Sequence, residues 1–264
     1  MIKTIHSRDN PLFKQLVKLA SSARERKKSG LTVLDGAHLV EAYCASQRQP
    51  RRVIVAASAM DLPETQAILA KVVCAEVVCF DDALMVEISA LESPAALMAL
   101  IDTPANAPLP AHATSCVVLE AIQDPGNVGS ILRSAAAADV RRVVLSPGCA
   151  FAWSPKVLRA AQGAHFALDI SEGVEVVEFV QRVFATEGQV LALAPKAESS
   201  LYDYDLTQAT AFLVGNEGAG LSSALMQVAH HRISIPMPGA MESLNVAASA
   251  AVCLFERVRQ LTHR

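Results

Sequence analysis

The sequence predicts an α/β protein built on a mostly parallel β-sheet with helices on both faces. Short apolar runs alternate with helical patterns along most of the chain, as expected when each strand is followed by a crossover helix. Several runs end in loops rich in glycine or proline, at residues 124–127, 215–220 and 236–240. Because ligands of parallel sheets bind at the carboxyl ends of strands, these loops form the candidate binding site.

The first part of the chain predicts a small α/β domain over residues 1–101. Leucines at helical spacing indicate a helix over residues 11–28, which ends at Gly30. The other elements expected here are strands at 31–35, 51–56 and 76–80, helices at 36–47 and 63–73, a short helix after 81, and the apolar run 95–101. Residues 102–112 contain three prolines and no apolar periodicity, so we expect a linker there.

The alternation restarts in a second predicted domain, over residues 113–264. The expected strands lie at 115–120, 142–146, 165–170, 189–194, 211–214 and 232–236, and the expected helices at 128–138, 155–161, 174–185 and from 243 to about 261. Asn127 and Ser243 suit the N-caps of the first and the last of these helices. The last helix is apolar on nearly every face, so we expect it to be buried in its own domain or, preferably, in a homodimer interface.

Composition excludes several classes of protein. Hydrophobic residues make up 52% of the 264 residues and charged residues 19%, which excludes a disordered chain. No apolar stretch reaches the roughly 18 residues of a membrane span, and the N-terminus lacks the apolar core of a signal peptide. The six cysteines include no C-x-x-C pair and complete no zinc pattern. We expect a cytoplasmic protein without structural metal and without a membrane partner.

The charge is distributed unevenly. Residues 1–52 carry eleven Lys and Arg against four Asp and Glu, whereas the remainder carries twelve against twenty-two. A basic front end on an acidic body indicates a polyanionic partner, most simply a nucleic acid; a solvated basic helix without a partner is the alternative. The cations expected to face this partner are Arg24, Arg26, Lys27 and Lys28.

Taken one at a time, the loops are ambiguous. Arg133 lies about two turns into the helix after Asn127, where an arginine is either a solvated charge or a group directed at an anion. The loop at 215–220 contains G-x-G-x-x-S and not the G-x-G-x-x-G of a dinucleotide site. A dinucleotide-dependent oxidoreductase therefore stays a weak alternative, and no phosphate-binding P-loop is present.

Taken together, three segments resemble the motifs of the SpoU (TrmH-like) family of RNA 2′-O-ribose methyltransferases, in the SPOUT superfamily. The matching segments are Asn127-Val-Gly-Ser-Ile-Leu-Arg133, Leu213-Val-Gly-Asn-Glu217-Gly-Ala-Gly-Leu-Ser222 and Ile235-Pro-Met-Pro-Gly-Ala-Met-Glu-Ser243-Leu-Asn245-Val-Ala. Their order and spacing fit the family over about 150 residues. The basic N-terminal part resembles the family's RNA-binding domain more loosely, because Asp35-Gly36 stands where Glu-Gly is usual.

The resemblance implies S-adenosylmethionine as the methyl donor, bound largely through backbone groups by Gly215, Ile235 and Leu244. It also implies a C-terminal trefoil knot, which pattern reasoning alone does not propose because threaded chains are rare. Finally, it implies an obligate homodimer through the C-terminal domain and an RNA substrate, ribosomal RNA being favoured over transfer RNA. A catalytically silent RNA-binding protein of the same fold is the alternative.

The resemblance assigns Arg133 as the group that activates the ribose hydroxyl. An arginine is a poor literal base because its pKa exceeds about 12, so we favour stabilisation of the developing alkoxide or of the adjacent phosphate. The residues expected to orient Arg133 and the ribose are Asn127, Glu217, Ser243 and Asn245.

Overall fold

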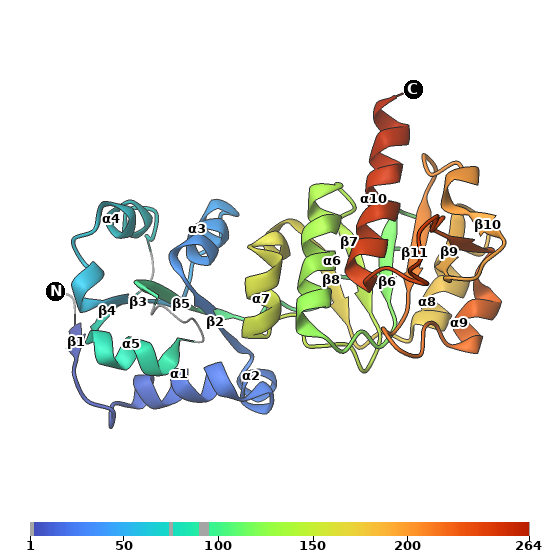
Figure 1. Cartoon of the computed structure of the whole chain (residues 1–264). Helices are drawn as coiled ribbons and strands as arrows, with labels where there is room; N and C mark the ends of the chain where they lie inside the picture. The colour runs from blue at the N-terminus through green and yellow to red at the C-terminus, as the bar shows by residue number, and fades with distance from the viewer. Residues whose placement is uncertain (1–2, 74–75, 90–94, 264) are drawn as a thin grey trace. The chain divides into compact units, whose positions relative to one another are not determined.

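The computed structural model describes residues 3–73, 76–89 and 95–263, and its contacts divide the chain into two compact units (Figure 1). The first unit comprises Met1–Ala105 with Trp153–Phe166, and the second Asn106–Ala152 with Ala167–Arg264. Each unit has its own β-sheet. No helix among the described residues combines the length and the hydropathy that a bilayer crossing needs.

The described residues of the first unit form a mixed sheet in the order β1-β4-β3-β5-β2. Its elements are β1 (Lys3–Ile5), α1 (Pro11–Ser21), α2 (Ala23–Ser29), β2 (Leu31–Asp35), α3 (Ala37–Ala45), β3 (Arg52–Ala56), α4 (Pro63–Leu69), β4 (Glu76–Phe80), α5 (Asp82–Ile88) and β5 (Leu97–Asp102). Strands β1, β4 and β3 are parallel, whereas β5 runs antiparallel to both β3 and β2. The apolar run near residue 100 is thus the strand that joins the two halves of this sheet.

The single helix predicted over residues 11–28 is wrong. The chain breaks at Ser22, whose φ of −116° and ψ of 112° are extended. Its hydroxyl accepts a hydrogen bond from the backbone N–H of Glu25 at 3.2 Å, so that Ser22 ends α1 and caps α2. Serine competes for backbone hydrogen bonds in this way and therefore favours helix ends over helix interiors.

The first unit also contains a segment that the sequence placed in the second domain. Residues 153–166 include α7 (Pro155–Ala161), and α7 packs on β2. Trp153 is buried, with its ring centroid 4.9 Å from that of His165, and the Phe166 ring lies 5.2 Å from that of Tyr43 on α3. Because these aromatic rings are buried against the first unit, residues 153–166 belong to it although they lie far along the chain. The division between the units is therefore not a single point in the sequence, as the predicted boundary was.

In the second unit the described residues form a parallel sheet in the order β10-β12-β9-β11-β6-β7-β8. The elements are β6 (Cys116–Leu119), α6 (Pro125–Ala137), β7 (Arg142–Leu145), β8 (Asp169–Glu172), α8 (Val176–Val183), β9 (Gln189–Leu193), β10 (Ser199–Ser200), β11 (Thr210–Val214), α9 (Ser223–Val228), β12 (His231–Ser234) and α10 (Val246–Thr262). The predicted α/β class is confirmed. The strand expected at 165–170 is wrong, because residues 164–167 form a 3₁₀ turn and β8 begins at Asp169. The trefoil knot stays a prediction.

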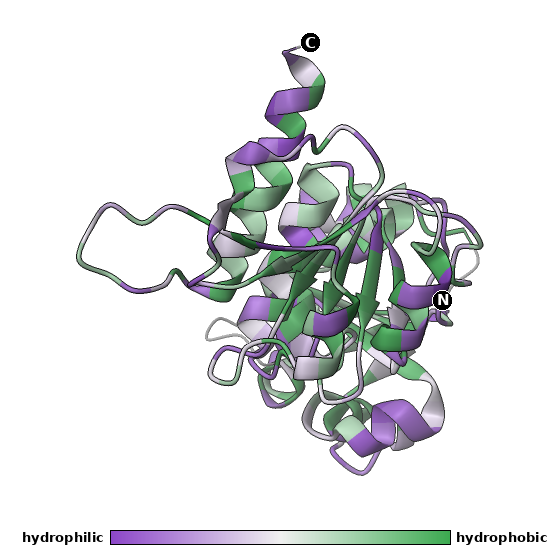
Figure 2. Cartoon of the chain, turned by 90° about the vertical axis from the view of Figure 1, so that its right-hand side faces the viewer, coloured by the Kyte–Doolittle hydropathy of each residue, from purple (hydrophilic) through white to green (hydrophobic). Residues whose placement is uncertain are grey.

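The core of the second unit lies on both faces of this sheet. Helices α8 and α9 pack on one face around Phe179, and α6 and α10 pack against each other on the opposite face (Figure 1). Figure 2 shows the central strands in the colour of hydrophobic residues, flanked by helices of mixed character. Strands buried on both sides read as continuous apolar runs, which is why β6 and β11 were predictable.

The described cysteines are free thiols. Burial raises the pKa of Cys116 and that of Cys253 to about 12, so both are inert at neutral pH. Cys74 lies outside the described residues. No group of three or more His, Cys, Asp or Glu among the described residues is arranged to hold a metal ion.

Candidate active site

The three motif segments meet at one edge of the parallel sheet. The first segment lies in α6, which follows β6, and the second and third contain the loops after β11 and β12, which lead into α9 and α10. Because the strands are parallel, their carboxyl ends lie at the same edge. β11 lies directly between β6 and β9, and β12 lies on the other side of β9. The predicted site is therefore assembled within the second unit.

Helix α6 begins earlier than predicted, and this changes the role of Asn127. Asp124 is the N-cap, since its Oδ1 accepts from the backbone N–H of Asn127 at 2.8 Å, and Pro125 is the first helical residue. The prediction that Asn127 caps the helix is thus wrong. Aspartate is an equally good cap and proline is favoured at the first helical position, so the Asp124-Pro125 pair was the signal in the sequence. The Asn127 side chain is left free for other contacts.

Asn127 joins two residues that are distant in sequence. Its Nδ2 donates to Oε1 of Glu217 at 3.0 Å, and its Oδ1 accepts from Nδ2 of Asn245 at 3.0 Å. One residue from each motif thus takes part in a single hydrogen-bonded chain. The contact joins positions separated by 90 and 118 residues, which no local sequence pattern specifies.

The direction of this chain of hydrogen bonds is set at both ends. An ionised Glu217 only accepts, so Asn127 must present its NH₂ to Glu217 and its oxygen to Asn245. Asn245 must then present its own NH₂ to Asn127 and keep its oxygen for other donors. That oxygen does accept, from the backbone N–H of Ala247 at 2.9 Å and of Ala248 at 3.3 Å. The amide orientations are therefore mutually consistent from the carboxylate to the helix.

Asn245, and not Ser243, is the N-cap of α10. The prediction of a Ser243 cap is wrong because the helix starts two residues later than that role requires. Ser243 is exposed and forms no hydrogen bond with the described residues. Asn245 consequently has two functions, since it starts α10 and orients Asn127.

The carboxyl of Glu217 is exposed, and its pKa is shifted downward. Partial burial alone would raise the pKa, but the hydrogen bonds from Asn127 and from backbone N–H groups, including that of Asp124, outweigh it. Hydrogen bonds to the ionised form lower a carboxyl pKa. Glu217 is therefore a carboxylate at neutral pH, as the polarity of the Asn127 contact requires.

Arg133 lies apart from this chain of residues. It is six residues beyond Asn127 on α6, which is about 9 Å along the axis and about 120° around it. Its side chain is exposed and makes no hydrogen bond or ion pair with the described residues. The structure thus brings together Asn127, Glu217 and Asn245, while Arg133 and Ser243 remain unengaged.

The loop at residues 215–222 folds tightly on itself. Asn216 and Gly220 exchange backbone hydrogen bonds of 3.0 and 2.9 Å. A Cβ on Gly215 would lie 2.4 Å from the backbone carbon of Gly220 and 2.4 Å from the backbone nitrogen of Leu221. Only glycine permits this approach of backbone to backbone.

The predicted donor-binding residues fit S-adenosylmethionine. Neither Gly215 nor Ile235 uses a backbone N–H or C=O in a hydrogen bond within the described chain, so these groups are available to a ligand. In the loop that follows β12, Leu244 is 40% exposed and Met241 is 71% exposed. Bare backbone groups together with apolar side chains suit a nucleoside that carries polar edges and a flat apolar face.

Of the predicted RNA-binding cations, three are presented to solvent and one is not. Arg24, Lys27 and Lys28 are exposed on α2. Arg26 is 6% exposed and donates to the carbonyls of Leu19 and, at 3.2 Å, of Ala20. Burial lowers the pKa of Arg26. Its role is to close the break between α1 and α2, so its assignment as an RNA contact is wrong.

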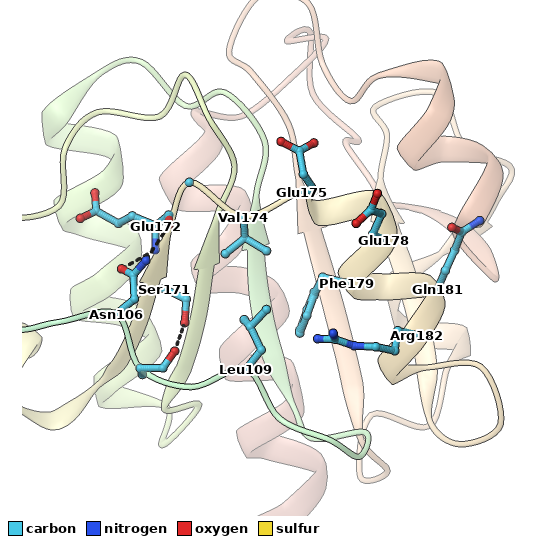
Figure 3. A pocket seen from close by; sticks show the side chains of 12 residues that line it. Asn106, Leu109, Ser171, Glu172, Val174, Glu175, Glu178, Phe179, Gln181 and Arg182 are labelled. Atoms are coloured by element: carbon cyan, nitrogen blue, oxygen red, sulfur yellow. Dashed lines mark hydrogen bonds between the residues drawn. The ribbon is translucent and has the colours of Figure 1, made fainter.

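A cavity of about 750 Å³ lies elsewhere in the second unit (Figure 3). It opens between residues 106–109 and α8, beside the end of β8, and Glu172, Glu175 and Arg182 are among its lining residues. In the sheet, β8 is separated from β11 by β7 and β6. None of the predicted site residues lines this cavity, and it is not part of the site.

Comparison with known proteins identifies the family. The model described as the SpoU rRNA Methylase family matches residues 114–255, and the MRM3-like substrate binding domain matches residues 10–99. The chain is 33% identical to an uncharacterized tRNA/rRNA methyltransferase of Synechocystis sp., over 98% of this chain and 94% of that protein. It is 30% identical to the 23S rRNA (guanosine(2553)-2′-O)-methyltransferase RlmP of Bacillus subtilis, over 96% and 98%. The structure of the SpoU methyltransferase AviRb from Streptomyces viridochromogenes with AdoMet covers 96% of this chain and 98% of its own, at 27% identity and a TM-score of 0.87.

The chain belongs to the SpoU rRNA methylase family. It is an RNA 2′-O-ribose methyltransferase that uses S-adenosylmethionine as methyl donor. The resemblance inferred from the three motifs is confirmed, and family membership gives the alternative of a dinucleotide-dependent oxidoreductase no support.

Proposed function

We propose that this enzyme methylates a ribose 2′-hydroxyl of ribosomal RNA. The observation that carries the proposal is the chain Glu217–Asn127–Asn245, which joins the three motif segments at the carboxyl edge of the sheet. Named relatives act on 23S rRNA, RlmP at a guanosine and a Streptomyces viridochromogenes enzyme at a uridine. Because these relatives modify different nucleotides, the proposal specifies the class of RNA and the 2′-hydroxyl but not the nucleotide.

When bound, S-adenosylmethionine supplies a methyl group that its sulfonium has already activated. The backbone groups of Gly215, Ile235 and Leu244, in the loops that follow β11 and β12, would hold it. Gly215 lies in a tight turn, whereas Leu244 lies in a loop without hydrogen bonds to the described chain. The protein's main contribution is then orientation of the ribose oxygen, which can account for roughly 7–11 kcal/mol of a barrier.

Arg133 acts on the RNA side of the reaction. Its guanidinium has no partner on the described chain, so it is available to neutralise the developing alkoxide or the adjacent phosphate. The hydroxyl proton leaves to phosphate or water, because an arginine with a pKa above about 12 does not accept it. Asn127 and Asn245, fixed by Glu217, position the ribose, and Ser243 provides a hydroxyl at the mouth of the site.

The first unit holds the RNA, and a second copy of the chain completes the assembly. Arg24, Lys27 and Lys28 on α2 supply contacts to the RNA backbone. On α10, Phe255 is 48% exposed and Leu261 is 41% exposed, which supports a homodimer through the second unit. A cytoplasmic location is part of the same proposal.

The decisive assay measures transfer of labelled methyl groups from S-adenosylmethionine to purified ribosomal RNA and, separately, to transfer RNA. The expected product is 2′-O-methylated ribose in ribosomal RNA. Label on bases alone, or no label despite measurable donor binding, contradicts the proposal; the latter result favours a silent RNA-binding protein.

The Arg133→Ala variant tests the proposed electrostatic role. We expect kcat to fall by about 10²–10³-fold, as on removal of a single stabilising donor elsewhere, with unchanged donor binding in calorimetry. Arg182→Ala, which removes another exposed arginine of the second unit, is the control and should leave kcat unchanged. Loss of donor binding in Arg133→Ala would contradict the assigned role.

Replacing Arg24, Lys27 and Lys28 together by Gln tests the RNA-binding face. Each lost phosphate contact reduces the magnitude of the slope of log affinity against log salt concentration by about 0.7–0.9. For the triple variant we therefore expect the magnitude of this slope to decrease by about 2–3. The matched control replaces three other cations of the first unit, namely Lys14, Arg52 and Lys71, so that the change in net charge is the same. An equal decrease in both variants would show that net charge, and not α2, determines binding.

A further inference from the structure

The end of β6 contains an unusual backbone conformation. Ala121 has a φ of 52°, in the left-handed region that residues other than glycine seldom adopt. Its N–H donates to the hydroxyl of Ser146 at 2.9 Å, and its carbonyl accepts from Nδ2 of Asn216 at 2.8 Å. Ala121 therefore directs the chain into the turn that precedes α6, and hence toward Asn127, while loops after two other strands hold it in place.

Asn216 uses every hydrogen-bonding position of its side chain. Nδ2 donates to the carbonyl of Ala121 and, at 3.4 Å, to Oε2 of Glu217. Oδ1 accepts from the backbone N–H groups of Gly218 and Ala219, at 3.0 Å each. Two donors and two acceptors are the full capacity of an amide. One side chain thus both shapes the loop after β11 and ties that loop to the end of β6.

We propose that Asn216 is a positioning residue for methyl transfer, whose amide fixes Glu217 and the loop after β6 relative to each other. Asn216 acts through Glu217 and Asn127 and belongs to neither the donor-binding nor the ribose-orienting set. The part of this inference that concerns methyl transfer rests on the proposed function. The part that concerns the position of the loop after β6 rests only on the contacts around Ala121.

An Asn216→Asp substitution separates the two roles. The retained oxygen still accepts from the loop N–H groups, so the donor loop keeps its shape. The new oxygen, when ionised, faces the carbonyl of Ala121 and the carboxylate of Glu217. The two loop N–H groups on the retained oxygen lower the pKa of the new carboxyl, but its other oxygen faces only acceptors. The charged groups on the two loops are all acidic, Glu217 on its own loop and Glu120 and Asp124 on the loop after β6, and together they raise this pKa. Once protonated, this carboxyl donates a hydrogen bond as the amide did.

The experiment compares kcat and donor Kd of N216D and the wild-type enzyme from about pH 5.5 to about pH 8.5. At the alkaline end we expect the variant's kcat to be about 10–100-fold below wild type, as for other losses of supporting contacts. We expect this deficit to shrink by at least about tenfold toward the acidic end, with Kd within about threefold of wild type throughout. Asn216→Ala, which removes both roles, should also weaken donor binding.

The matched control is Asn106→Asp, since the Asn106 side chain also makes two hydrogen bonds with a backbone, that of Glu172 at the end of β8, at 2.9 and 3.0 Å. This variant should show no pH-dependent deficit. A deficit in N216D that is equal at every pH, or a kcat equal to wild type, overturns the proposal.

Hydrogen exchange of residues 121–127, measured without RNA or donor, gives a second readout that does not require activity. We expect faster exchange in N216D than in wild type at the alkaline end, and unchanged exchange overturns the proposal. If N216D does not fold, the comparison is made between A121G and A121G/N216D, because glycine adopts a positive φ without strain. If wild type transfers no methyl group, the proposed function fails, and the exchange measurement alone decides the role of Asn216.

Discussion

The two loops proposed to hold the donor are built in opposite ways. In the loop at residues 215–222, Asn216 and Gly220 are paired through their backbones, the Asn216 side chain makes four hydrogen bonds, and the backbone of Ser222 donates to Glu120 at 2.7 Å. In the loop at 236–244, no backbone or side-chain hydrogen bond connects any residue to the described chain. Nearly all of this second loop is exposed.

From this difference we expect one side of the proposed donor site to be formed before the donor binds and the other side to become ordered on binding. A pre-organised wall reduces the entropy lost on binding, while an open wall admits the ligand. The prolines at 236 and 238 restrict the second loop without hydrogen bonds, because their rings fix φ.

The largest effect is expected from Gly215→Ala in the rigid loop. The added Cβ would lie 2.4 Å from backbone atoms of Gly220 and Leu221, and overpacking of this kind costs about 1–3 kcal/mol. Donor affinity, measured by calorimetry, should fall by about 10–100-fold. Gly239→Ala in the open loop is the matched control, because nothing lies within 4 Å of its Cβ position. Equal losses in the two variants would remove the contrast between the loops.

Hydrogen exchange with and without S-adenosylmethionine should distinguish the loops directly. We expect donor binding to slow exchange in residues 236–244 by about tenfold or more, and in residues 215–222 by less than about twofold, because the latter are already hydrogen-bonded. Exchange by mass spectrometry resolves both segments. Similar protection of the two loops would contradict a pre-formed wall.

A smaller effect is expected from Asn245→Ala, where the open loop meets α10. Loss of an asparagine N-cap lowers the free energy of unfolding by about 1 kcal/mol, and loss of the contact to Asn127 should lower kcat as well. Ser243→Ala, two residues away, removes a hydroxyl without a hydrogen-bond partner on the described chain and should leave stability unchanged. A thermal unfolding series checks both, and destabilisation by the serine variant alone would restore Ser243 as the cap.

Much of the fold could be predicted because buried strands and helix signals are local. The helix at residues 155–161 and the strands at 31–35 and 76–80 were predicted to the residue. Two of the errors lie where two capping residues compete over a few positions, as Asp124 does with Asn127 and Asn245 with Ser243. Arg26 is a different kind of error, since a basic run does not reveal which of its members turns inward.

The sequence by itself determined the family, the class of reaction and the motif segments, because motifs and strand–helix alternation are local patterns that can be recognised in short stretches of the chain. Only the tertiary structure decided which side chains of those segments meet. Glu217, Asn127 and Asn245 form one hydrogen-bonded chain because parallel strands end at a common edge. Asn216 joins the loop after β11 to the loop after β6, although the sequence analysis assigned roles only to its neighbours Gly215 and Glu217. Contacts across about 90 residues or more depend on sheet order and loop path, and neither is encoded in the spacing of a motif.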